Sequence, residues 1–146
     1  MSYAILLILH LAAAVAFIGT LFYQVVIWRA ATSELAESSL QEVSARLSAV
    51  TRKVLHWVVM VLYGAGIGLA WHYRGVLADP FGSPFATLLT LKILLALSIV
   101  GHYLAIAVLL RRGRLTVRRN RLLHLAVLLQ MLLIIVLAKG MFHFSW

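Results

Sequence analysis

Four long stretches of the chain contain almost no charged side chains. Residues 3–28 and 54–73 contain no Asp, Glu, Lys or Arg, and residues 80–110 and 122–146 contain one lysine each. A helix of about 20 apolar residues crosses a hydrocarbon core roughly 30 Å thick, so each stretch is long enough to span a bilayer. Because lipid cannot satisfy backbone hydrogen bonds, each stretch is predicted to be a helix.

The pattern predicts an all-α, integral membrane protein built as a four-helix, up-down-up-down bundle. None of the stretches has the polar face that a helix of a soluble bundle presents to water. Short connections imply antiparallel neighbours. No linker separates independent parts, so residues 1–146 are expected to form a single transmembrane domain. The four helices are predicted at residues 3–28, 39–73, 85–110 and 117–142.

Two local patterns refine the second helix. Apolar residues recur at steps of three and four from Leu40 onward, which indicates a helix that begins before the apolar stretch. Ser39 followed by Glu42 fits a capping box, so this helix is expected to start near Ser39. Gly64 and Gly68 have the small-xxx-small spacing that allows a neighbouring helix to approach closely.

The net charge of +9 is concentrated in two of the three connections between these helices. The basic residues there are Arg29, Arg46, Arg52 and Lys53, and then Arg111, Arg112, Arg114, Arg118, Arg119 and Arg121. A four-span topology puts both connections on one side, and the positive-inside rule makes that side cytoplasmic. We therefore expect a bacterial inner-membrane protein with both termini in the periplasm. Its basic clusters are expected to contact anionic lipid headgroups rather than nucleic acid.

Six histidines stand out in a chain that is 64% hydrophobic and has no cysteine. Without cysteine, disulfides, thiolate chemistry and Cys-ligated metal clusters are excluded. Ionisable residues within a membrane are costly and usually have a partner or a function. His72 and His143 lie within about a turn of the outer water, where an interfacial role is an adequate explanation and cofactor binding is the alternative. His56 and His124 lie roughly a turn inside the inner edge, where interfacial and ligand roles are both open.

His10 and His102 lie deepest, and a cofactor or hydrogen-bond role is favoured for them because a buried imidazole needs a partner. Neutral imidazole is a common metal ligand, and haem iron is one of the metals it binds. A b-type haem needs no covalent Cys attachment and suits an apolar core. Two axial pairs are open, His102 with His124 and His56 with His124, and His10 is a further candidate ligand.

Lys92 is the remaining candidate for chemistry within the membrane. It lies about as deep as His10, so its ammonium group cannot easily reach water. Its expected role is a contact with a carboxylate, such as a haem propionate or an anionic substrate. Copper is the competing metal, although its reduced state prefers Cys and Met ligands, and the few methionines do not cluster.

Several residues in the apolar stretches together form a pattern that is typical of a known group of membrane proteins. The first stretch combines His10 with Phe17, Gly19, Leu21, Phe22 and Tyr23, and the later stretches carry Lys92, Gly101, His102 and Lys139. With the basic loop before the last helix, these positions resemble a bacterial group that holds the copper resistance protein D family and the HemJ-type protoporphyrinogen oxidases. The resemblance implies a membrane unit of four or more helices. It implies haem b and porphyrinogen oxidation in the HemJ branch, and copper handling in the inner membrane in the other. Residues 3–7 and 24–26 differ from the HemJ pattern. The prediction of haem binding rests on the histidines and is unaffected, whereas the prediction of oxidase activity rests on the resemblance.

Three hypotheses follow for the function. The first is a haem b-binding inner-membrane protein with a redox role, either electron transfer or oxidation of a porphyrinogen or quinol. Its partners would be the lipid bilayer and a quinone, a porphyrinogen or another redox membrane protein, and a homo-oligomer is compatible with it. The second is a copper resistance-like protein that transports or handles copper. The third is a non-catalytic membrane subunit whose histidines are interfacial.

Overall fold

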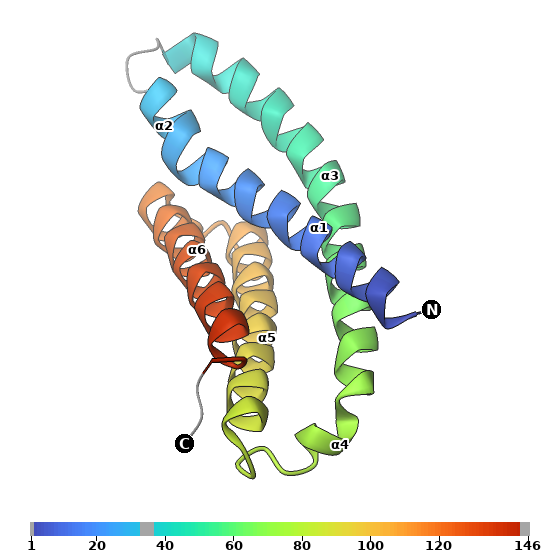
Figure 1. Ribbon diagram of the computed structural model, residues 1–146. Helices are drawn as coiled ribbons and strands as arrows, with labels where there is room; N and C mark the ends of the chain where they lie inside the picture. The colour runs from blue at the N-terminus through green and yellow to red at the C-terminus, as the bar shows by residue number, and fades with distance from the viewer. Residues whose placement is uncertain (1, 33–36, 144–146) are drawn as a thin grey trace. The chain divides into compact units, whose positions relative to one another are not determined.

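The computed structural model describes residues 2–32 and 37–143, and every regular element in these ranges is helical (Figure 1). Four helical segments are long and apolar enough to cross a membrane, namely Tyr3–Ile27, Gln41–His72, Pro84–Arg111 and Arg118–Gly140. The predicted all-α, membrane-spanning class is confirmed. The chain divides after His72 into two compact units. Each unit is a helical hairpin and is described by itself, and their assembly into one four-helix domain stays a prediction.

The first hairpin opens with a helical rod, residues 3–31, whose winding changes toward its C-terminal end. The rod consists of α1 (Tyr3–Phe22), the five-residue π-helical turn η1 (Tyr23–Ile27) and the short α2 (Trp28–Ala31). Ser2 caps its start, because the hydroxyl oxygen accepts a hydrogen bond from the backbone N–H of Ile5 at 3.5 Å. The predicted helix over residues 3–28 is therefore present and extends slightly further. Residues 23–27 contain no Pro or Gly, so the sequence gives no signal for this π turn.

The second element of this hairpin is α3 (Glu37–His72), a helix of 36 residues. Within the described residues α3 begins two residues before Ser39, close to the predicted start, but Ser39 lies inside the helix, so the predicted capping box at Ser39 is wrong. Glu42 has a different partner, since its Oε1 lies 2.9 Å from a guanidinium nitrogen of Arg46 one turn later. This pair stabilises the helix within the polar part of its surface.

α1 packs against α3 along one face, and small residues of α3 make the close approach possible. A Cβ built on Gly68 would lie 3.0 Å from Leu6, and one built on Gly66 would lie 3.1 Å from His10. A Cβ on Gly64 would have nothing within 4 Å. Close approach is thus confirmed at Gly68, but its companion is Gly66 rather than Gly64.

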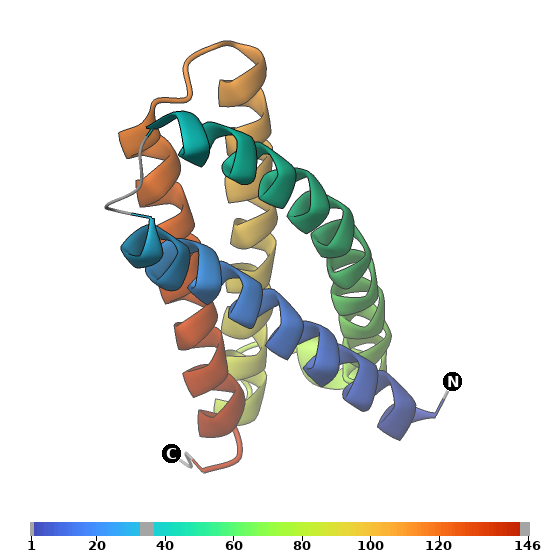
Figure 2. The same ribbon diagram turned by 90° about the horizontal axis from the view of Figure 1, so that it is seen from above.

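The second hairpin consists of the short α4 (Arg74–Leu77), α5 (Pro84–Arg111) and α6 (Val117–Gly140). The long helices α5 and α6 pack side by side, as both views show (Figures 1 and 2). Their buried side chains are Ala86, Leu89 and Ile99 on α5, and Val127, Leu128 and Met131 on α6. This pairing agrees with the antiparallel neighbours that the short connection predicts.

Local sequence signals explain where these two helices begin. Ser83 caps α5 through a hydrogen bond from the N–H of Ala86 at 3.1 Å, and Pro84 occupies the first turn, where its missing N–H is tolerated. Thr116 caps α6 in the same way, accepting from the N–H of Arg119 at 3.3 Å. Between the helices, Gly113 takes a φ of 64°, a left-handed conformation that suits glycine at a helix end.

Candidate functional site

His102 lies on α5 and is half-buried. Its Nδ1 lies 2.8 Å from the backbone carbonyl of Ser98, one turn earlier in the same helix. A carbonyl oxygen only accepts, so Nδ1 carries the proton, and the lone pair of the neutral ring is on Nε2. The ring is therefore oriented by its own helix, with the nitrogen that can bind a metal directed away from the backbone.

His124 on α6 repeats this arrangement. It is half-buried, and its Nδ1 donates to the carbonyl of Asn120 at 2.8 Å. A histidine that binds a metal commonly donates its other ring N–H to a carbonyl or carboxylate, which fixes the tautomer. Both imidazoles thus have the hydrogen bond that a ligand needs.

The two histidines also lie at matching levels of the hairpin. His102 precedes the end of α5 at Arg111, and His124 follows the start of α6 at Val117. At a rise of about 1.5 Å per residue, they lie roughly 13 Å and 10 Å along their helices from the connecting loop. Each is one turn nearer that loop than a buried residue of the packed face, Ile99 or Val127. The prediction of a shared layer on adjacent helices is therefore consistent with their positions.

His10 has a different environment, because its partner is on another helix. Its Nδ1 donates to the carbonyl of Leu62 on α3 at 2.9 Å, and the ring is half-buried. This carbonyl can be reached because the residue one turn later is Gly66, whose missing side chain leaves room for the imidazole. The sequence predicted a hydrogen-bond or cofactor role for His10. The hydrogen bond is present, and the pairing with Gly66 was missed.

The other three histidines are exposed. His72 donates to the carbonyl of Gly68 at 2.9 Å, and its ring meets that of Tyr3 edge to face with centroids 5.7 Å apart. His143 donates to the carbonyl of Lys139 at 3.1 Å. His56 lies beside Trp57, with ring centroids 5.8 Å apart. Their exposure fits interfacial side chains, and the pairing of His56 with His124 stays a prediction.

The two intramembrane lysines differ in exposure. Lys92 on α5 is half-buried, whereas Lys139 near the end of α6 is exposed. The difference agrees with the expectation that only Lys139 reaches water readily. The expected contact of Lys92 with an anionic group stays a prediction.

Within either hairpin, the described residues contain no group of three His, Asp or Glu side chains that could hold a metal ion. No family model, curated protein or solved structure matches the chain. The resemblance to the copper resistance and HemJ group therefore stays a prediction. What the site offers chemically is a pair of oriented imidazoles in an apolar hairpin, a third imidazole in the other hairpin, and one half-buried ammonium group.

Proposed function

We propose that this chain is a haem b-binding protein of the bacterial inner membrane with a redox role. The observation that carries the proposal is the pair His102 and His124. Both are half-buried at one level of a packed helical hairpin, and each is oriented by a hydrogen bond from Nδ1 to its own helix. Either or both would hold the iron through Nε2.

The donor set suits haem better than a bare metal ion. A site built from protein side chains alone needs three or four ligands in one place, and neither described hairpin gathers three. In haem the porphyrin provides four nitrogens, so the protein supplies only one or two axial ligands. When bound, haem b supplies one-electron redox chemistry, which serves electron transfer or oxidation of a substrate.

Lys92 and His10 have supporting roles in this proposal. Lys92 lies ten residues before His102 on α5, about 15 Å along the helix axis. It is proposed to contact an anionic group, either a haem propionate or a substrate carboxylate. His10 is proposed as a further ligand, or as the residue that holds α1 on α3 through Leu62.

The orientation is part of the same proposal. The loop that joins α5 and α6, together with the helix ends on either side of it, carries six of the seven arginines of the second hairpin, and the segment before α5 carries Arg74 and Asp79. The positive-inside rule then assigns the first loop to the cytoplasm and the second to the periplasm.

Histidine variants with matched controls test the haem site. We expect His102→Ala and His124→Ala each to lower the haem content of the purified protein by roughly tenfold or more, the scale of ligand-shell losses at metal sites. His143→Ala is the control, because His143 makes the same type of hydrogen bond to its own helix but is exposed. It should retain the Soret absorbance.

The reduced-minus-oxidised spectrum of each variant is the measurement. Equal absorbance in all three variants would indicate that these histidines are interfacial and do not bind haem. Bound copper without any haem in the wild-type protein would support the copper-handling hypothesis instead.

A further inference from the structure

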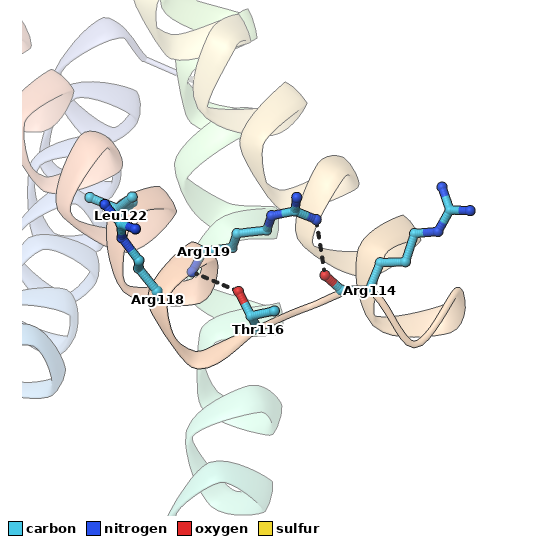
Figure 3. Close-up of a pocket in the computed structure, with 5 residues that line it drawn as sticks. All are labelled: Arg114, Thr116, Arg118, Arg119 and Leu122. Carbon is cyan, nitrogen blue, oxygen red and sulfur yellow. Dashed lines mark hydrogen bonds between the residues drawn. The ribbon is translucent and has the colours of Figure 1, made fainter.

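A pocket of about 580 Å³ lies where the loop after α5 turns into α6 (Figure 3). The residues that line it are Arg114, Thr116, Arg118, Arg119 and Leu122. All five belong to the second hairpin, at the end where both membrane-length helices meet the loop. The proposed haem ligands lie further along the helices, so this pocket is separate from the site described above.

Hydrogen bonds within the loop hold the pocket in shape. The backbone N–H of Arg114 donates to the carbonyl of Leu109 at 2.9 Å, and the guanidinium of Arg119 donates to the carbonyl of Arg114 at 3.3 Å. The hydroxyl oxygen of Thr116 accepts from the N–H of Arg119. Figure 3 shows Arg119 extending toward this loop carbonyl, while Arg118 lies beside Leu122.

The one acidic residue of this hairpin is Asp79, which precedes α5 and is far from the pocket in the sequence. Residues 80–146 contain no Asp or Glu. The guanidinium groups of Arg114, Arg118 and Arg119 therefore have no carboxylate from that part of the chain. Each guanidinium presents a fork of N–H donors that matches phosphate oxygens. Because Thr116 already satisfies the N–H of Arg119, the attraction for an anion comes from the side chains rather than from the start of the helix.

The position of the pocket indicates which phosphate it would meet. It lies at the end of two helices of membrane-spanning length, where headgroups are found. Leu122 is 54% exposed and continues the lining toward the apolar part of α6, the direction of lipid chains. We infer that this pocket binds the headgroup of an anionic glycerophospholipid, with its phosphodiester among the arginine side chains that line the pocket and Leu122 beside its first acyl carbons.

The same chemistry disfavours a zwitterionic lipid. Phosphatidylcholine would bring its own ammonium group next to three guanidinium groups, and like charges at this distance repel. Phosphatidylglycerol brings only the anion and hydroxyl groups that can hydrogen-bond. The pocket should therefore distinguish the two lipids, whereas a merely apolar helix end would not.

The test is a lipid titration of the full-length protein in detergent, followed by native mass spectrometry. The dissociation constant of the first bound phosphatidylglycerol is compared with that of phosphatidylcholine. Near a membrane surface each arginine contributes about 1 kcal/mol, or roughly fivefold in affinity. We expect the triple variant Arg114→Gln, Arg118→Gln, Arg119→Gln to weaken phosphatidylglycerol binding on the order of tenfold or more.

A control removes the same number of charges from the same region without touching the pocket. Arg111→Gln, Arg112→Gln, Arg121→Gln should change the dissociation constant by less than about threefold, the remainder being long-range attraction. If both triple variants weaken phosphatidylglycerol binding equally, the inference that the lipid binds in this pocket is wrong. Equal affinity of the wild-type protein for the two lipids would contradict it as well.

Two further arms keep the result decisive. If the triple variant loses helical content, Arg118→Gln alone is used, because Arg118 donates no hydrogen bond within the described part of the protein. It should weaken phosphatidylglycerol roughly fivefold. Displacement of the lipid by inorganic phosphate, at an ionic strength matched with chloride, would identify a site for soluble phosphate and contradict the lipid assignment. Retention of the lipid supports it.

Discussion

An imidazole within an apolar helix needs an acceptor for its ring N–H, and this chain supplies one in two ways. His102 and His124 use a carbonyl of their own helix, which orients each ring on that helix. His10 uses the carbonyl of Leu62 on another helix, so its ring joins α1 to α3. The same residue type therefore forms the proposed haem site in one hairpin and takes part in helix packing in the other. The depth of these residues followed from counting along the chain, but the choice of acceptor required the structure.

Lys92 offers a prediction at the same scale. If its ammonium group contacts a propionate, Lys92→Met should lower haem retention by about tenfold, since a charge-assisted hydrogen bond contributes on the order of 1.5–3 kcal/mol. Insertion should be unimpaired or improved, because methionine is apolar. Haem content per inserted protein is the measurement. Lys139→Met is the matched control, as Lys139 is exposed, and its haem content should not change. Equal haem content in both variants would contradict the proposed contact.

At the scale of helices, the packing of α1 on α3 depends on where side chains are missing. A Cβ at Gly66 would lie 3.1 Å from Cε1 and 3.3 Å from Nδ1 of His10, and that ring is held by a 2.9 Å bond to Leu62. The ring could yield only by lengthening this bond. Interhelical hydrogen bonds in membranes contribute about 0.6 kcal/mol on average and up to about 1.7 kcal/mol.

Gly66→Ala is therefore expected to lower the free energy of unfolding by about 1 kcal/mol, measured by denaturant titration in mixed micelles. Gly64→Ala should be neutral or slightly stabilising, since nothing lies within 4 Å of a Cβ there. In the background of His10→Ala, the cost of Gly66→Ala should disappear. A cost that persists without His10 would show that the contact is not the cause.

The helices themselves could be predicted from the sequence because uninterrupted apolar length determines a membrane span. The predicted range 85–110 and the observed α5 (Pro84–Arg111) differ by one residue at each end. Features that depend on contacts were not predictable in the same way. The π turn η1 carries no breaker residue, Ser39 lies inside α3 although it is followed by Glu42, and Gly66 rather than Gly64 meets α1. Likewise, the basic cluster was evident, but the pocket formed by its loop was not.

For the molecule as a whole, the proposed orientation rests on the uneven distribution of charge, and the lack of cysteine makes it testable. Phe81, 85% exposed, lies in the loop before α5, and the exposed Arg112 lies in the loop after it. A membrane-impermeant maleimide added to intact spheroplasts should label Phe81→Cys. It should label Arg112→Cys only after permeabilisation. The opposite labelling would place the arginine-rich loop outside and contradict the proposed topology.

The central claim is that the oriented imidazoles of this apolar chain hold haem b. The most direct measurement is the haem content of the full-length protein, purified from haem-replete cells and quantified as the pyridine haemochrome. The account predicts haem b in near-stoichiometric amount, with a Soret band and with α and β bands that appear on reduction. A folded, fully helical protein without any chromophore would contradict it.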